Sequence, residues 1–193
     1  MQSSNSPFDV LRKLAAQTVE VGASRSSAND TAVAVSGIGF SLCGKPMIAK
    51  MGEVVEVVKP PKSTFVPGAK PWLLGIANLR GRLLPLIDLE AFIGAKLIGN
   101  NSFHRVLVVE VGDVYVGLVV SRVFGLKHFS ASQVIDSVDC SNELYEHLVD
   151  GACDDNGEQW LRFSIRELVK NEQFNDISFS HISDTSVFAR SVA

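Results

Sequence analysis

Apolar and polar residues alternate with a period of two along much of the chain from about Val33 onward. Ile38, Phe40 and Leu42, for example, are separated by small or polar residues. A period of two places side chains alternately on the two faces of an extended segment and therefore predicts β-strands. Further strands are expected over residues 47–50, 53–58, 74–79, 83–87, 105–111, 114–120, 124–129, 134–138, 148–153 and 159–163.

Glycine-containing turns separate these strands. Cys43–Pro46 forms a tight turn, and Asp155–Gly157 marks a hairpin between two apolar runs. Gly112 and Asp113 form a two-residue hairpin signal, in which glycine supplies a positive φ at the first turn position. Eight or more short, regularly spaced strands indicate small barrels or a sandwich. The sequence lacks the alternation of strands with long helices that would indicate a parallel sheet.

Two short helices interrupt the strands. Asp88 can cap a helix over Leu89–Ile93, and Ser164 can cap one over Ile165–Val169. Both caps are residue types whose side-chain oxygen accepts a hydrogen bond from the first turn of a helix. Glu167 stands three positions after Ser164, the spacing of a capping box. The fold class expected is therefore mainly β with short helices.

The two ends of the chain have a different character. Pro7–Glu20 has apolar residues at roughly helical spacing, and the small polar segment Gly22–Asp30 follows it. The tail from about Phe174 combines scattered aromatic residues with many serines, so we expect partial disorder there. This predicts an N-terminal helix and flexible linker over residues 1–32, a globular domain over 33–171 and a C-terminal tail over 172–193.

Composition narrows the classes of function. Of the 193 residues, 46% are hydrophobic and 20% charged, which is typical of a soluble globular protein, and the net charge of −3 does not favour nucleic acid or an anionic membrane. We expect no signal peptide, and the most apolar stretch, residues 106–120, is interrupted by Glu110 and Asp113 and is too short to span a bilayer. Three widely spaced cysteines suggest reduced thiols and a cytoplasmic location.

The residues that could carry out chemistry do not form a recognisable set. Gly39–Lys45 matches most of a phosphate-binding loop, but Pro46 replaces the Ser or Thr that would bind magnesium, and a β-hairpin is the better interpretation. Glu53 and Glu56 should point to opposite faces of a strand. The four histidines lack metal-ligand spacing. We therefore predict no catalytic residue, cofactor or metal, while an enzyme or a nucleic-acid-binding barrel remains an alternative to test.

The most distinctive segment is an apolar hairpin whose turn carries two cations, Arg80 and Arg82. Two interpretations of Arg80 are open and compatible. Arg80 could attach the turn to a neighbouring loop, or it could present its planar set of donors to a partner protein.

This segment also carries a resemblance. Residues Gly75–Leu89 read G-x-x-N-L-R-G-x-x-x-P-x-x-D-L, which resembles the signature of CheW-like domains, and the resemblance extends over about residues 38–169. Pro67–Pro85 and Val123–Phe129 are similar to the adaptors of type IV pilus (twitching motility) chemosensory systems.

The resemblance implies two five-stranded, SH3-like β-barrel subdomains packed together within residues 33–171. It implies a non-catalytic adaptor that couples the cytoplasmic tip of a methyl-accepting chemoreceptor to the regulatory domain of a CheA-type histidine kinase in pilus-driven motility. An adaptor of a flagellar or other chemosensory array is the alternative. Such adaptors are cytoplasmic, monomeric alone and assembled in arrays, with no direct membrane insertion and no nucleic acid partner.

The resemblance also places candidate partner-binding residues. Three groups are expected: a contact strand of the first barrel, the turn beside a receptor groove, and a strand lining that groove. They contain, respectively, Val54 and Glu56; Gly75, Asn78, Leu79 and Arg80; and Val116, Gly117 and Val119. We expect Leu79, Val116 and Val119 to act as apolar anchors for a receptor helix, with Arg80 at the polar rim. Ser121 replaces an aspartate that many family members have.

Overall fold

The fold is taken from a computed structural model that describes residues 33–97, 99–136, 138 and 145–179. The helix and linker predicted for residues 1–32 lie outside the described residues, as do residues 180–193 of the predicted tail. Within the described ranges, the structure contains no helix long and apolar enough to cross a membrane.

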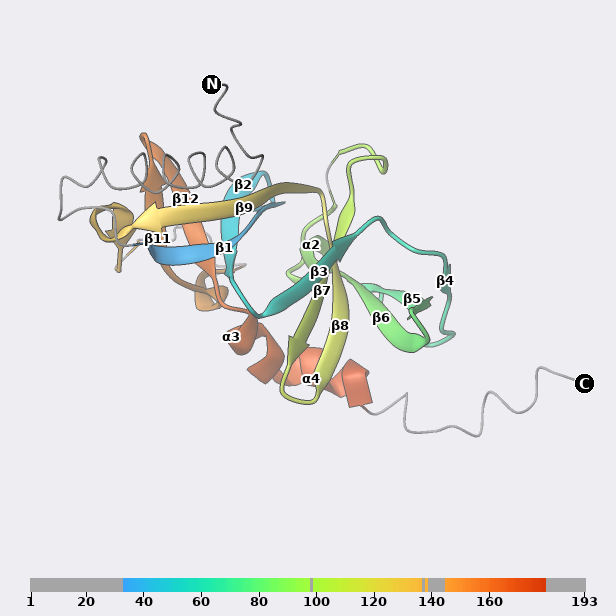
Figure 1. The fold of residues 1–193 in the computed structure, drawn as a ribbon. Helices are drawn as coiled ribbons and strands as arrows, with labels where there is room; N and C mark the ends of the chain where they lie inside the picture. The colour runs from blue at the N-terminus through green and yellow to red at the C-terminus, as the bar shows by residue number, and fades with distance from the viewer. Residues whose placement is uncertain (1–32, 98, 137, 139–144, 180–193) are drawn as a thin grey trace, which may run out of the picture. The chain divides into compact units, whose positions relative to one another are not determined.

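In the described part of the chain, twelve strands form two sheets of six (Figure 1). The first sheet contains, in spatial order, β10 (Val134–Ile135), β11 (Val149–Asp155), β12 (Glu158–Phe163), β2 (Lys45–Lys50), β1 (Val33–Leu42) and β9 (Arg122–Ser130). The second contains β3 (Val54–Val58), β7 (Arg105–Val111), β8 (Val114–Val120), β6 (Arg82–Asp88), β5 (Leu73–Leu79) and β4 (Ser63–Thr64). Since β10 and β4 have two residues each, every sheet has five longer strands, and the predicted mainly β class is confirmed.

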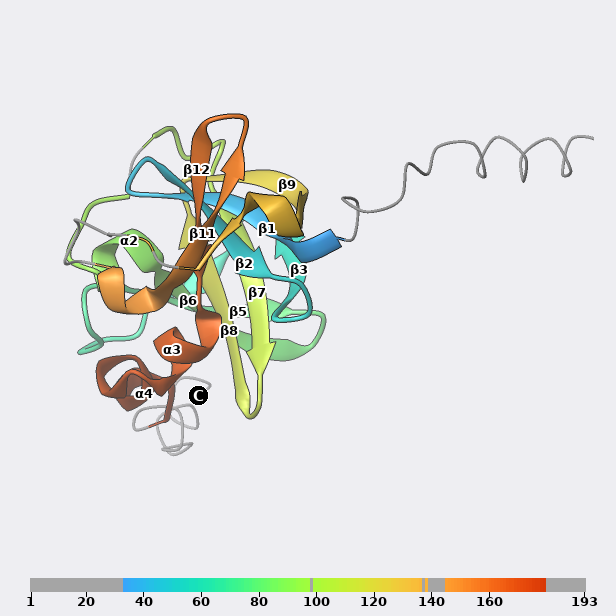
Figure 2. The same ribbon diagram turned by 90° about the vertical axis from the view of Figure 1, so that its left-hand side faces the viewer.

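The two sheets divide the chain unequally. The second is built from the continuous segment 54–120, whereas the first combines β1 and β2 with strands that follow this segment, between residues 122 and 163 (Figure 2). A parallel pairing of β12 with β2 joins these distant parts and sets Phe163 opposite Ala49. The second sheet has a comparable parallel pairing of β6 with β8, in which Leu86 lies opposite Gly117.

Three hairpin turns have the same backbone geometry. Cys43–Gly44, Arg80–Gly81 and Asn156–Gly157 each combine two consecutive positive φ angles. This is the type I′ turn that the right-handed twist of antiparallel strands favours. Gly112 has a φ of 59°, so the turns predicted at 43–46, 112–113 and 155–157 are confirmed.

One apolar core lies between the two sheets. The rings of Phe40 and Phe163, both in the first sheet, meet edge to face with their centres 5.5 Å apart. They belong to the same buried cluster as Leu107 and Leu118 of the second sheet. A smaller cluster lies within each sheet. The strands β7 and β8 therefore bury side chains on both faces, which explains their nearly continuous apolar sequences.

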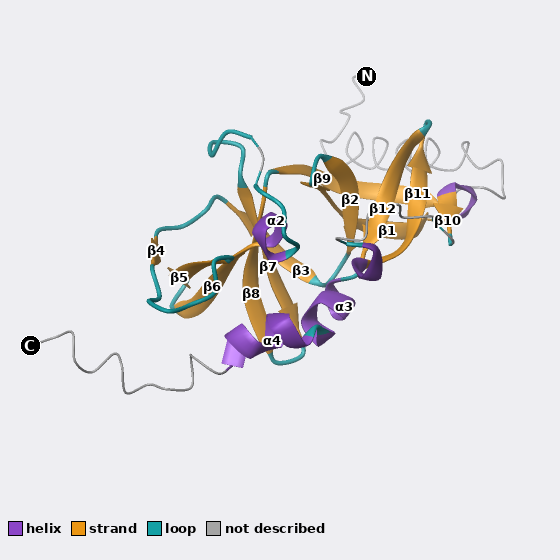
Figure 3. Ribbon diagram, turned by 180° about the vertical axis from the view of Figure 1, so that it is seen from behind, coloured by secondary structure: helices purple, strands orange, loops and turns teal. Residues whose placement is uncertain are grey.

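The helices lie at the ends of strands (Figure 3). The predicted caps are confirmed, because α2 (Leu89–Phe92) has Asp88 as its N-cap and α3 (Ile165–Lys170) has Ser164. Single 3₁₀ turns occur at residues 131–133 and 146–148.

A further helix, α4 (Glu172–Phe179), was not predicted. Its Phe174 is fully buried. The Phe174 ring stacks on Trp72, with the ring centres 6.4 Å apart, and meets Phe92 edge to face, with the ring centres 5.5 Å apart. The expected tail from residue 172 therefore begins with a helix whose aromatic residue belongs to the shared core.

Candidate partner-binding site

The turn between β5 and β6 is fixed by its own short-range contacts. Arg80 and Gly81 occupy its two central positions, with φ angles of 54° and 84°. The Asn78 side-chain oxygen accepts a hydrogen bond from the Gly81 backbone N–H at 2.8 Å. A non-glycine residue at positive φ is uncommon, so the backbone places Arg80 in a conformation that glycine or asparagine would adopt at lower cost.

Arg80 attaches this turn to the opposite edge of the sheet. Its Nη2 donates to Oε1 of Glu56, on β3, at 2.6 Å. Because β3 and β5 lie near opposite ends of the hydrogen-bonded strand order, the ion pair shows that the sheet curls far enough to bring the β5–β6 turn beside β3. The Arg80 side chain remains 76% exposed, so it can hold the turn and still offer donors to a partner.

The neighbouring cation, Arg82, makes a second ion pair. Its guanidinium donates to both oxygens of Glu110 at 3.0 and 3.3 Å and lies 3.6 Å from the centre of the Tyr115 ring. The hydrogen bond with Arg82 lowers the pKa of Glu110, and it raises the pKa of Arg82. Arg82, on β6, is therefore held by residues of β7 and β8, whereas Arg80 is held by Glu56 of β3.

Four predicted residues lie inside the protein rather than on a groove. Val54 and Val116 belong to the shared core, and Val119 belongs to the inner cluster of the second sheet. Gly117 is buried so closely that an added Cβ would lie 2.7 Å from Cγ1 of Val106. Val116 and Val119 therefore cannot be the apolar anchors that we expected, because the core already occupies both strand faces.

Gly75 has a structural reason of its own. Its φ is 140°, and a Cβ there would lie 2.4 Å from the backbone oxygen of Thr64. Glycine at this position thus allows β4 to pair with β5. Leu79, half-buried, packs against the inner cluster of the second sheet.

Sequence reasoning missed apolar side chains that are exposed near the ion pair. Val55 and Val57 flank Glu56 on β3 and are 52% and 37% exposed, and Leu83, opposite Asn78 in the β5–β6 register, is 60% exposed. The signal available was the alternation within Val54–Val58, since exposed Val55 and Val57 alternate with the buried or half-buried residues of β3. Val55, Val57 and Leu83 are thus exposed apolar side chains on β3 and β6, whereas the predicted valines are buried.

The structure also locates the residues screened for chemistry. The segment Gly39–Lys45 is the β1–β2 hairpin, so the hairpin interpretation is confirmed. Glu53 pairs with Arg166 at 3.2 Å, away from the Glu56–Arg80 pair. Among the described residues, no three or more His, Cys, Asp or Glu side chains are grouped to hold a metal ion.

The two described cysteines, Cys43 and Cys153, are not activated as thiolates, because burial raises the pKa of both thiols. Burial raises the pKa of Cys43, with a smaller contribution from the Glu90 carboxylate, and burial also raises the pKa of Cys153. Ser121, at the position of the family aspartate, donates to the Ser41 carbonyl at 3.4 Å, so this site forms a neutral contact.

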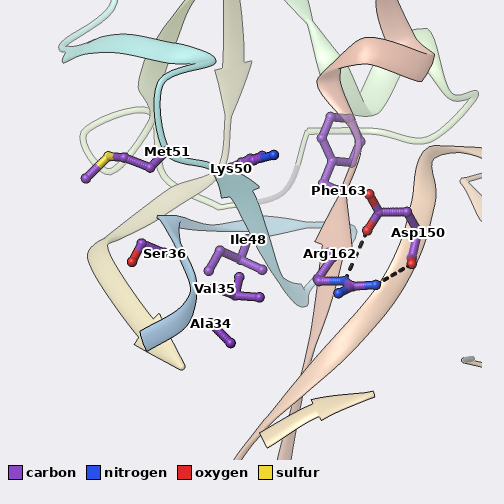
Figure 4. A pocket seen from close by; sticks show the side chains of 9 residues that line it. All are labelled: Ala34, Val35, Ser36, Ile48, Lys50, Met51, Asp150, Arg162 and Phe163. Atoms are coloured by element: carbon purple, nitrogen blue, oxygen red, sulfur yellow. Dashed lines mark hydrogen bonds and ion pairs between the residues drawn. The ribbon is translucent and has the colours of Figure 1, made fainter. Parts of the chain in front are cut away.

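A separate cavity of about 570 Å³ lies on the first sheet, at the ends of its strands (Figure 4). Val35, Ile48 and Phe163 supply apolar walls. The Arg162 guanidinium donates a hydrogen bond to the backbone carbonyl of Asp150 at 2.6 Å. Nε of Arg162 also lies 3.1 Å from Oδ1 of Asp150, but without the alignment of a hydrogen bond. Its charge is thus already compensated.

Two small β-barrel subdomains around one core, with the Asn78–Gly81 turn held on β3, define a CheW-like domain. The chain belongs to this family, whose model matches residues 36–173. The resemblance inferred from the sequence is therefore confirmed.

Similar proteins support this family assignment. The chain is 35% identical to protein PilI of Pseudomonas aeruginosa over 178 residues, which cover 92% of this chain and 99% of PilI. It is 33% identical to the chemotaxis protein CheW of Helicobacter pylori over 97 residues, half of this chain and 59% of the relative. The scaffolding protein TtCheW of Thermoanaerobacter tengcongensis has the same fold, with a TM-score of 0.62 and 23% identity over 72% of this chain and 94% of its own. The chain is thus a CheW-like adaptor of chemosensory systems.

Proposed function

We propose that this protein is a non-catalytic adaptor that couples the cytoplasmic tip of a methyl-accepting chemoreceptor to the regulatory domain of a CheA-type histidine kinase. The observation that carries the proposal is the Glu56–Arg80 ion pair, which fixes a mostly exposed guanidinium at the tip of an otherwise apolar hairpin. A scaffold needs no reacting group, because holding two partners together raises their effective concentration.

In this proposal, a helix of the partner protein docks beside the turn. A helix-in-groove contact requires apolar anchors with a polar rim. Val55, Val57 and Leu83 are exposed apolar residues that could act as anchors, and Arg80 and Asn78 could form the rim. Because the ion pair fixes the turn before binding, the partner would meet an ordered surface and lose less entropy on association.

The system that we propose is the chemosensory pathway of type IV pili and twitching motility. The support is the likeness to PilI, which extends over 99% of that protein, whereas the likeness to the CheW of Helicobacter pylori covers 59% of it. In this proposal the protein acts in the cytoplasm beside membrane receptors, is monomeric alone, uses no cofactor and joins arrays through its partners.

Binding of the purified full-length chain to both partners tests the proposal. We expect calorimetry to give a Kd on the order of 1 μM or tighter for a CheA-type regulatory domain from a pilus system, and retention of a receptor cytoplasmic fragment by the pair. Binding of neither partner would contradict the adaptor, and binding only to flagellar counterparts would contradict the pilus assignment. A thermal shift or turnover with ATP and magnesium would favour the enzyme alternative.

A further inference from the structure

Charge is unevenly distributed along the sequence. Residues 57–87 contain five cations and no Asp or Glu, in a chain whose net charge is −3. The five are Lys59, Lys62, Lys70, Arg80 and Arg82. This segment is therefore the exception to an otherwise mildly acidic protein.

Among these five cations in the described part of the chain, the two arginines have ion-pair partners and the three lysines do not. Arg80 pairs with Glu56 and Arg82 pairs with Glu110. The three lysines are exposed, and in the part of the chain that the structure describes no carboxylate lies within ion-pair distance of them. They lie on either side of β4, and we call the segment Lys59–Lys70 the basic edge.

β4 is the last strand of the second sheet among the described residues. It pairs with β5 on one side, where Ser63 lies opposite Ala77, and has no strand on the other side. Figures 1 and 3 show β4 and its loops at the outer side of this sheet. Lysines and prolines on an edge strand often serve to prevent edge-to-edge aggregation, so they do not by themselves indicate a partner.

Phe65 is not explained by protection of the edge. It directly follows β4 and is 69% exposed, more than any other large apolar residue in the described part of the chain. An exposed aromatic beside an unpaired edge would promote aggregation rather than prevent it. The pairing of Thr64 with Ile76, which Gly75 makes possible, holds the backbone before Phe65 in place. The ring thus lies directly after a paired strand.

We propose that the basic edge is a docking site for an acidic, extended segment of a partner protein. Backbone groups of the segment would pair with the free side of β4, as in β-strand addition. An apolar side chain of the segment would cover Phe65, and its carboxylates would face Lys59, Lys62 and Lys70. This surface is distinct from the Glu56–Arg80 turn and adds a partner-binding element to the adaptor.

Fluorescence anisotropy of labelled peptides with the full-length protein tests the proposal. The probe is an octapeptide of Asp and Glu with one Phe and one Leu, and the comparison peptide has the same charge with Ser in place of Phe and Leu. We expect the first peptide to bind at least about tenfold more tightly than the second, and to weaken as salt rises.

Matched variants separate the basic edge from general electrostatics. K59Q/K62Q/K70Q and Phe65→Ser should each weaken binding of the Phe-Leu peptide at least about tenfold. K45Q/K50Q/K96Q changes the net charge equally at exposed lysines elsewhere and should weaken it less than about threefold. Equal losses for both triple variants, or no effect of Phe65→Ser, would overturn the proposal.

Two further measurements complete the test. Preferential binding to an oligothymidylate or to phosphatidylglycerol vesicles over the Phe-Leu peptide would overturn the proposal in favour of another polyanion. K59Q/K62Q/K70Q should still bind the kinase domain and receptor fragment. Loss of those partners as well would overturn the independence of this edge, whereas failure of the wild-type chain to bind them concerns the adaptor function alone.

Discussion

Arg80 and Glu56 are separated by 24 positions in the sequence, yet their side chains meet at 2.6 Å. The contact joins the β5–β6 turn to β3, although the two elements lie near opposite ends of the strand order. Arg80 has a φ of 54°, a conformation that costs most non-glycine residues on the order of 1 kcal/mol. A glycine would form this turn more easily. The contribution of Arg80 therefore comes from its guanidinium and not from its backbone.

The first prediction concerns Arg80→Ala. We expect binding of the kinase domain or receptor fragment to weaken at least about tenfold, while the free energy of unfolding changes by about 1 kcal/mol or less, since exposed ion pairs contribute little stability. Calorimetry and urea unfolding measure the two effects. Arg166→Ala is the matched control, because Arg166 is 69% exposed and pairs with Glu53 away from the turn.

A glycine substitution separates the turn from its side chain. Arg80→Gly relieves the strain of the positive φ, so the free energy of unfolding should stay equal or rise while partner binding weakens as much as in Arg80→Ala. If Arg80→Ala unfolds the protein and the folded fraction binds normally, Arg80 has a structural role only.

The second prediction distinguishes packing from recognition at two glycines. Gly117→Ala should lower the free energy of unfolding by about 1–3 kcal/mol, because the new methyl group would lie 2.7 Å from Val106 and 2.8 Å from Leu86. Gly75→Ala should cost at least as much, since its Cβ would meet the Thr64 backbone at a φ of 140°. Urea unfolding measures both losses, and partner affinity per folded molecule should stay unchanged for Gly117→Ala.

Gly81→Ala is the control for these glycines. Its φ is 84° but an added Cβ would meet open space, so only conformational strain of about 1 kcal/mol is expected. A larger loss for Gly81→Ala than for Gly117→Ala would show that backbone conformation, and not close packing, dominates at these positions.

Local signals were sufficient to predict the turns and helix caps. A type I′ turn depends on a few adjacent residues such as Asn156–Gly157, and a cap depends on one residue such as Ser164. The strand β4 was missed because it has two residues beside prolines. Its existence depends on Gly75 of the neighbouring strand, which no local pattern reveals.

Site residues were harder to predict, because strands that are buried on both faces have no period that identifies an outer side. Val116 and Val119 therefore looked like surface anchors but lie in the core. The Glu56–Arg80 pair was also out of reach, since it depends on how far the sheet curls. Both features arise from tertiary packing rather than from neighbouring residues.

The third prediction concerns the helix that replaces the start of the expected tail. Phe174→Ala should lower the free energy of unfolding by about 3–5 kcal/mol, because it removes a buried ring from its contacts with Trp72 and Phe92. Urea unfolding followed by tryptophan fluorescence measures this loss. Phe65→Ala is the control, and its 69% exposed ring should contribute about 0.5 kcal/mol or less. Equal effects of the two substitutions would contradict a core role for α4.

The last prediction concerns acid stability and the Arg82–Glu110 pair. The hydrogen bond from Arg82 lowers the pKa of Glu110 in the folded protein, so this pair stabilises the fold above the ordinary glutamate pKa. That contribution is lost as the pH falls through the lowered pKa. Glu110→Gln should therefore reduce the urea midpoint at neutral pH, and its difference from wild type should shrink in acid. In an Arg82→Ala background the same substitution should have no pH-dependent effect; a difference that persists there would assign the titration to another partner of Glu110.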